Sequence, residues 1–328
     1  MATTLARSRA PYARPAAEVR AGHRGNPPVG WLLALGVVSL IPYGGALWLN
    51  DLRAHTREFE IVFFAAFALY AVAVVRVLRI AEDVPWPRGT LPLIFGFAVL
   101  FRALLVFSTP TLTDDMYRYV WDGRVQAQGL NPYALPPDAP ALTSLRDEAV
   151  WPFINRKSVV TVYPAGAQLA FAALWRLVPD NVRWFQVAMA SGDLLAGVLL
   201  ARLLRALGQP PQRALIYLWS PLVIFETAHA AHVDGLVLPV LVAAWLARAC
   251  GRDGLTGAFL GLATALKLYP AMLLPALWRP TGDGARGWRR WRMSLSFVAV
   301  FAATYVPYLS LGGGVIGFLP TYFTERFK

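Results

Sequence analysis

The sequence has 328 residues, of which 57% are hydrophobic and only 15% are charged. About a quarter of the residues in a soluble domain are charged, so this composition excludes an ordinary soluble fold. The formal net charge is +12, and the basic residues lie mainly in the N-terminal segment and in short loops between apolar blocks. That distribution is typical of membrane topology signals, and we expect membrane lipids, and no nucleic acid, as partners.

Residues 1–29 are rich in Arg, Ala and Pro and contain no apolar run of helix length. We expect a disordered, basic tail that stays in the cytoplasm. The next block is long enough to span a bilayer, and no small-residue cleavage site follows it, so we interpret it as a retained helix rather than a signal peptide. Residues 30–328 then form one transmembrane domain. The apolar blocks are 30–49, 59–80, 91–109, 164–179, 184–206, 214–228, 233–249, 254–278 and 293–311.

Arginines in the short loops orient these blocks. The first block leaves the cytoplasm, the second returns to it at Arg76 and Arg79, and the third leaves again, which makes 110–163 a large outer loop. Arginines separately place the loops 202–213 and 279–292 in the cytoplasm. With these sides assigned, neither 164–179 nor 254–278 can cross completely, and Pro270 interrupts the second of them. Broken helices at membrane depth occur where they line a cavity. We therefore expect an all-α, polytopic transmembrane helix bundle with a large outer loop and re-entrant half-helices.

The outer loop contains an acidic pair, Asp114 and Asp115, followed by a helical pattern that ends at Gly129. We expect an amphipathic helix at the membrane interface. One side carries the polar residues Asp115, Arg118, Asp122 and Gln126. The opposite side, which we expect to face the membrane, carries Met116, Tyr117, Val120 and Trp121.

The acidic pair has two interpretations, which are helix capping and general-base catalysis. In glycosyl transfer from a sugar phosphate, the leaving phosphate is weakly basic and needs no acid, so one carboxylate can suffice. A cation must then offset the charge on the phosphate. Lys267 lies beside the helix break, and Arg102 lies inside the third block, where snorkelling to the headgroups is the alternative. The candidate cations are Arg102, Arg118, Arg124 and Lys267.

A second polar cluster lies where the block 214–228 ends and the block 233–249 begins, on the same side as the acidic pair. Its members are Glu226, His229, His232 and Asp234. A hydrogen-bonded turn is the simpler interpretation, and a metal site is the alternative, with Asp115, His232 and Asp234 as possible ligands. Asp193 lies inside an apolar block, and we expect it to face the bundle interior.

In its order of motifs, the sequence resembles GT-C membrane glycosyltransferases that use polyprenyl-phosphate sugars, and most of all their bacterial mannosyltransferase-like group. The resemblance covers residues 95–280. The matching elements are Asp114-Asp115, Arg118-Tyr119-Val120-Trp121-Asp122-Gly123, Asn131-Pro132-Tyr133, Tyr163-Pro164, Asp193-Leu194-Leu195, Trp219-Ser220-Pro221, His232-Val233-Asp234-Gly235 and Lys267-Leu268-Tyr269-Pro270.

The resemblance implies inverting transfer of a hexose, expected to be mannose, from a polyprenyl-phosphate sugar to a lipid or glycan acceptor. The reaction would occur at the outer face of a bacterial plasma membrane. One of Asp114 and Asp115 would be the catalytic base, and the other would position the acceptor or a divalent cation. The resemblance leaves the need for this cation open, because some GT-C enzymes use a metal and others do not. We expect substrate and phosphate to bind among Arg102, Arg118, Arg124, Lys267, Tyr269, Asp234, His232 and Tyr163.

Two alternatives belong to other classes. One is a membrane transporter or flippase with Asp193, Asp234 and Lys267 along its path, and the other is a non-catalytic assembly subunit of GT-C type. The sequence also departs from the pattern of many GT-C enzymes, because its large outer loop follows three apolar blocks, whereas theirs follows the first. Relatives usually continue with further helices beyond Lys328, so a C-terminally truncated product is a further expectation.

Overall fold

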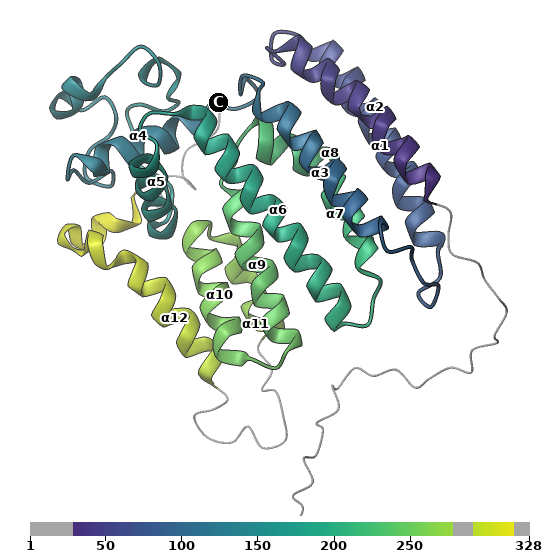
Figure 1. Ribbon diagram of the computed structural model, residues 1–328. Helices are drawn as coiled ribbons and strands as arrows, with labels where there is room; N and C mark the ends of the chain where they lie inside the picture. The colour runs from purple at the N-terminus through teal and green to yellow at the C-terminus, as the bar shows by residue number, and fades with distance from the viewer. Residues whose placement is uncertain (1–28, 278–290, 318–328) are drawn as a thin grey trace, which may run out of the picture.

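The computed structural model describes residues 29–277 and 291–317 (Figure 1). The described residues form helices joined by turns, with no β-strand among them, which confirms the all-α prediction. The predicted N-terminal tail lies outside the described residues except for Val29. Four of the described helical segments are long and apolar enough to cross a membrane. They are Gly30–Leu49, Thr56–Arg79, Val182–Ala206 and Arg292–Ser310.

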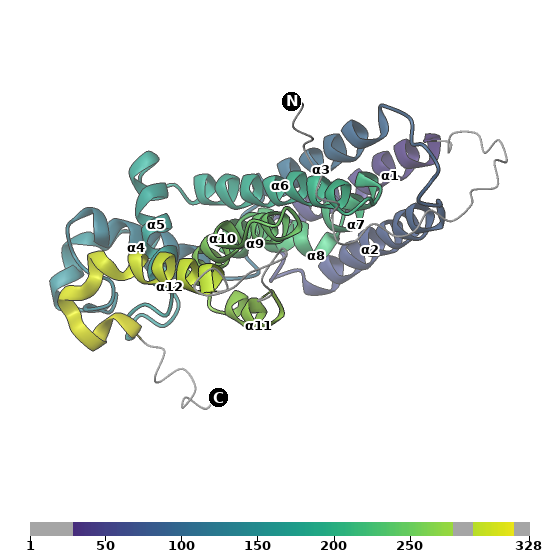
Figure 2. The same ribbon diagram turned by 90° about the horizontal axis from the view of Figure 1, so that it is seen from below.

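The helices α1 and α2 lie at one side of the bundle (Figures 1 and 2). At the other side lie α4 (Asp115–Ala127), α5 (Ala165–Leu177) and α12 (Arg292–Tyr305). Between them runs α6, the longest helix, which packs closely against α9. A Cβ atom on Gly192 of α6 would lie 2.4 Å from the backbone oxygen of Gly235 in α9, so the two backbones touch. The bounds are α1 Gly30–Leu49, α2 Thr56–Arg79, α3 Thr90–Val106, α6 Val182–Ala206 and α9 Asp234–Ala249.

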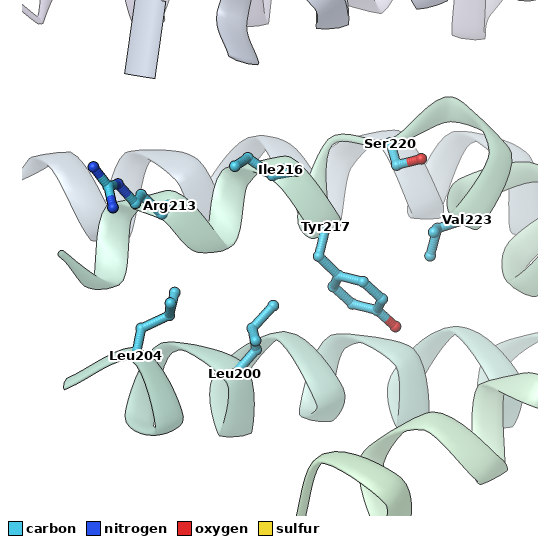
Figure 3. Close-up of a pocket in the computed structure, with 7 residues that line it drawn as sticks. All are labelled: Leu200, Leu204, Arg213, Ile216, Tyr217, Ser220 and Val223. Atoms are coloured by element: carbon cyan, nitrogen blue, oxygen red, sulfur yellow. The ribbon is translucent and has the colours of Figure 1, made fainter. Parts of the chain in front are cut away.

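The chain between α6 and α9 consists of short helical pieces that include one π-helical turn. A groove of about 440 Å³ separates these pieces from α6, and Tyr217 points across it toward α6 (Figure 3). The Tyr217 hydroxyl hydrogen-bonds the carboxylate of Asp193, which is fully buried, as predicted. The pieces are η3 Pro211–Ala214, α7 Leu215–Leu218, α8 Pro221–Ile224 and the π-helical η4 Phe225–His229.

The block 254–278 is broken, as the sequence predicts. Its helix α10 ends at Leu266, and Lys267 is extended. In α12, Met293 lies against Gly257 and Phe297 lies against Gly261, so α10 and α12 run in the same direction and the chain must return between them. The bounds are α10 Asp253–Leu266, η5 Tyr269–Leu273, α11 Leu274–Leu277 and α12 Arg292–Tyr305.

The large loop and the helix α5 that follows it form a small helical subdomain at the end of the bundle where α6 begins (Figure 1). Helix α5 has 13 residues and is therefore about 20 Å long, too short to cross a bilayer core of about 30 Å. This length agrees with the prediction that the block 164–179 does not cross. The bounds are α4 Asp115–Ala127, η1 Pro140–Leu145, η2 Trp151–Phe153 and α5 Ala165–Leu177.

The helix predicted after the acidic pair is present as α4, but the prediction that its apolar side faces the membrane is wrong. Tyr117 stacks on Phe153 of η2, with ring centroids 4.9 Å apart. Tyr119 stacks on Phe171 of α5 at 4.4 Å. The rest of the outer loop folds back over α4 and supplies apolar partners, so the side chains expected in lipid form a core. The buried ones are Met116, Tyr117, Val120 and Trp121.

Candidate active site

The carboxylate of Asp115, the first residue of α4, lies among polar groups from distant parts of the chain. Its Oδ1 accepts a hydrogen bond of 2.9 Å from the amide of Asn155, and its Oδ2 lies 3.8 Å from Nε2 of His232. The side chain is 36% exposed, so a ligand can reach it. We define the Asp115 cluster by its members Asp115, Asn155, Glu226, His232, Asp234 and Lys267.

The π-helical turn η4 brings Glu226 and His232 together, and Glu226 hydrogen-bonds Nδ1 of His232. Single π-helical turns are frequent at functional sites. Ala231, which follows the turn, has a φ of 53°, an uncommon backbone conformation for a residue with a Cβ atom. Burial acts to lower the pKa of His232, but the hydrogen bond and charge of Glu226, with the charge of Asp115, raise that pKa above its usual 6.5.

Lys267 follows the end of α10 and lies close enough to His232 that its charge acts to lower the pKa of that residue. Its Nζ lies 2.5 Å from Oδ2 of Asp234 and 6.0 Å from the ring centroid of Tyr269. The side chain of Lys267 is 43% exposed. The structure therefore brings together five residues singled out from the sequence: Asp115, His232, Asp234, Lys267 and Tyr269.

The other member of the acidic pair is directed elsewhere. Oδ1 of Asp114 accepts a hydrogen bond of 3.1 Å from Arg53, which lies between α1 and α2 and is 57% exposed. Asp114 occupies the N-cap position of α4, but its side chain makes no capping hydrogen bond. The sequence did not single out Arg53 or Asn155. The one signal that could have found them is their position in segments predicted to lie at the outer face.

Arg118 and Tyr163 lie beside the cluster. The buried guanidinium of Arg118 donates from Nε to Asp122 over 2.8 Å and from Nη2 to the backbone oxygen of Val159 over 3.2 Å. Asp122 is also buried, and its carboxylate neutralises the charge of Arg118 in this ion pair. The ring of Tyr163 meets Tyr119 edge-on at 5.0 Å. Arg118 and Asp122 thus form a structural ion pair at the edge of the site.

Arg102 makes no hydrogen bond to the Asp115 cluster. Its side chain is 2% exposed, and its Nε lies 2.5 Å from Asp193 of α6. It also donates to the backbone oxygens of Ala98 and Leu218. The snorkelling alternative is therefore wrong, and Arg102 joins three segments inside the bundle instead of presenting a charge to a substrate.

Arg124 is likewise engaged away from the cluster. It bridges Asp147 and Asp180, donating to the latter from Nε over 2.7 Å. Burial acts to raise the pKa of Asp147, but hydrogen bonds from Arg124 and from two backbone N–H groups lower it to about 2. Arg124 therefore ties the outer loop together, and the structure does not bring this predicted phosphate-binding residue to the site.

The possible metal ligands do not converge on one point. His232 gives Nδ1 to Glu226, and Asp234 is held by Lys267. His229 lies in a hydrogen-bonded turn, as the simpler interpretation predicts, with Nδ1 2.7 Å from the Ser108 hydroxyl. Within residues 29–277 and 291–317, no group of three or more His, Cys, Asp or Glu residues could hold a metal ion. The three possible ligands therefore do not form a divalent-cation site among the described residues.

Two comparisons with known proteins bear on this site. Residues 29–279 match the family model described as alpha-(1->6)-mannopyranosyltransferase, N-terminal domain. The chain is also similar to alpha-(1->6)-mannopyranosyltransferase A of Mycobacterium tuberculosis, with 25% identity over 230 residues. That match covers 67% of this chain but only 43% of the relative, so the chain spans less than half of the curated relative's length.

The matched family segment contains the whole Asp115 cluster and every predicted site residue. It extends over more than half of the chain, from α1 to the residues that follow α11. The chain therefore belongs to the alpha-(1->6)-mannopyranosyltransferase family, whose N-terminal domain it contains.

Proposed function

We propose that this chain transfers mannose from a polyprenyl-phosphate sugar to a lipid or glycan acceptor at the outer face of a membrane, with inversion at the anomeric carbon. The observation that carries the proposal is the Asp115 cluster. It combines a partly exposed carboxylate with a partly exposed lysine in a chain of a mannopyranosyltransferase family. Mannose as the sugar follows from the family description, and the lipid carrier follows from the sequence resemblance.

In the proposed reaction, Asp115 is the general base. It removes the proton of the acceptor hydroxyl as that oxygen forms a bond to the anomeric carbon. The bond between the anomeric carbon and the phosphate oxygen breaks, and polyprenyl phosphate leaves with the bonding electron pair. A single displacement of this kind inverts the anomeric configuration. No acid is needed, because the phosphate leaves without a proton at neutral pH.

Lys267 is the cation that we assign to the leaving phosphate. It is the only one of the four candidate cations that is both a member of the cluster and substantially exposed, at 43%. The other three are more deeply buried in carboxylate ion pairs, with side chains 2% to 7% exposed. Asp234 holds Lys267 in place before substrate binds, and His232 lies 3.8 Å from the base. Preorganised charge of this kind stabilises developing negative charge with little reorganisation.

The outer-face location rests on the basic loops. Arg202, Arg205 and Arg213 lie at or after the end of α6, whereas the Asp115 cluster lies near its beginning. The positive-inside rule favours a cytoplasmic position for the arginine-rich end and so supports an outer position for the cluster.

The test uses the purified chain in lipid with radiolabelled polyprenyl-phosphate mannose and a panel of lipid and glycan acceptors. We expect label to move to one acceptor class, and the product's anomeric configuration to be opposite to that of the donor. Label that enters sealed vesicles without covalent transfer would support a transporter instead. The absence of both transfer and uptake, with every acceptor in the panel, would contradict the proposed activity for this chain.

A further inference from the structure

The two halves of the Asp115 cluster come from segments that are more than 100 residues apart. Asp115 follows the segment 108–113, and the Glu226–His232 pair belongs to η4 and the turn after it. The Asp115 and His232 side chains are 3.8 Å apart at their nearest nitrogen and oxygen, which is longer than a hydrogen bond. Their own contact therefore does not fix their separation, and other groups must set it.

His229 connects the two segments. It is fully buried, and its Nε2 accepts a hydrogen bond of 3.3 Å from the backbone N–H of Thr111. Its Nδ1 lies 2.7 Å from the hydroxyl of Ser108, which itself donates to the backbone oxygen of Leu105. The hydroxyl proton is thus already used, so Nδ1–H of His229 donates to Ser108. This neutral tautomer satisfies both ring nitrogens.

Gln186 of α6 makes a second connection at the same place. Its side chain is buried, and Nε2 lies within hydrogen-bond distance of three backbone oxygens. These belong to Ser108 at 3.2 Å, Ala228 at 3.2 Å and His229 at 3.1 Å. One amide group therefore anchors both the segment before Asp115 and the end of the π-helical turn to the long helix α6.

We propose that His229 and Gln186 are positioning residues that set the distance between Asp115 and the Glu226–His232 pair. Thr111 is four residues before Asp115, and His229 is three residues before His232, so a shift at their hydrogen bond moves both halves of the cluster. Neither residue belongs to the cluster itself. The inference rests on the proposed function, because the catalytic readout requires mannose transfer.

The kinetic test compares His229→Leu and Gln186→Leu with the conservative variant His229→Gln. Misplacement by about 1 Å can lower turnover about 100-fold, so we expect kcat to fall by that order in both Leu variants. The donor KM should stay within about threefold, because no phosphate ligand is removed. His229→Gln keeps one donor and one acceptor, and it should recover most of the lost kcat.

A matched control separates positioning from general loss of a buried polar group. The hydroxyl of Thr264 in α10 is buried and bonds only to the backbone oxygen of Leu260 in its own helix. Thr264→Val should therefore lower thermal stability without lowering kcat more than about twofold. Unchanged kcat in both Leu variants, or an equal loss of kcat in Thr264→Val, would overturn the proposal.

Hydrogen exchange provides a readout that needs no activity. The backbone amides of residues 108–115 should exchange faster in His229→Leu than in the wild type, because the Thr111 amide loses its acceptor. Thr264→Val should leave this segment unchanged. If the wild type transfers no mannose but this contrast is present, the proposed function fails and the coupling of the two segments stands. If the contrast is absent, the coupling itself is refuted.

Discussion

Asp114 and Asp115 are neighbours in the chain, yet their carboxylates have different partners. Asp114 pairs with the exposed Arg53 at 3.1 Å, whereas Asp115 accepts a hydrogen bond from Asn155 and lies beside His232. Successive side chains on a helix point about 100° apart, which agrees with the different partners of the two carboxylates. The structure thereby distinguishes two residues that the sequence treated as equivalent.

The first prediction follows from this asymmetry. Asp115→Asn should lower kcat by about 100-fold or more, the contribution of a general base. Asp114→Asn removes only an exposed ion pair, which contributes about 0–1 kcal/mol, so kcat should fall less than about fivefold. Transfer of radiolabelled mannose measures both. If Asp114→Asn proves the more damaging change, our assignment of the base is reversed.

The second prediction concerns Lys267 as the cation for the phosphate. Lys267→Met should lower kcat/KM by about 100- to 1,000-fold, and Lys267→Arg should retain a larger part of it. Arg124→Gln is the comparison variant, because its partners Asp147 and Asp180 are not members of the cluster. It should lower the melting temperature and leave kcat within about threefold. Equal kinetic defects in Lys267→Met and Arg124→Gln would argue against a specific role for Lys267.

The third prediction concerns the buried ion pair between Arg102 and Asp193. Replacing one partner leaves the other charge buried without compensation, so Arg102→Leu or Asp193→Leu should destabilise the fold by about 3–5 kcal/mol. The double variant should be less destabilised than the sum of the two, because it buries neither charge. Thermal unfolding in detergent measures this coupling. Strictly additive losses would mean that the pair has no net interaction.

The fourth prediction is a pH dependence centred on His232. Its pKa is raised in the folded protein, so the stability it contributes is fully present below about pH 6.5 and is lost as pH rises through the folded pKa. Glu226→Gln removes the largest cause of the raised pKa. We expect its melting temperature to fall furthest below the wild type at acidic pH, with the gap narrowing above neutrality. A gap that widens with pH would show that the sign is wrong.

The fifth prediction tests the close packing of α10 on α12. A Cβ atom at Gly257 would lie 1.9 Å from the backbone oxygen of Met293, so Gly257→Ala forces the helices apart and should destabilise by about 1–3 kcal/mol. Gly254 lies on the same helix, where a Cβ atom would meet only the Ser296 hydroxyl at 3.7 Å. Gly254→Ala should therefore be neutral or stabilising by up to about 1 kcal/mol. Thermal unfolding of the two variants makes the comparison, and equal melting temperatures would contradict the packing argument.

Much of the architecture followed from local properties of the sequence. Apolar blocks of helix length predicted the helices, because a bilayer-spanning segment must satisfy its backbone hydrogen bonds internally. Pro270 and the loop arginines predicted the break after α10, which the structure contains. The environment of α4 was not predictable in this way. An amphipathic pattern shows that one side avoids water, and it does not distinguish lipid from the folded outer loop that covers it.

The sequence alone determined the all-α bundle, the broken helix and the types of residue available for chemistry, because hydrophobic length, proline and charge act locally. Only the tertiary structure decided how those residues are used. All four candidate cations pair with carboxylates, and three of those pairs hold the fold together. Arg118 pairs with Asp122 four residues along α4, whereas the other three cations pair with carboxylates from other segments. Burial requires a charge to be paired, so the function of a charged side chain depends on which partner the fold supplies. For Lys267 that partner is Asp234, which leaves the lysine side chain 43% exposed.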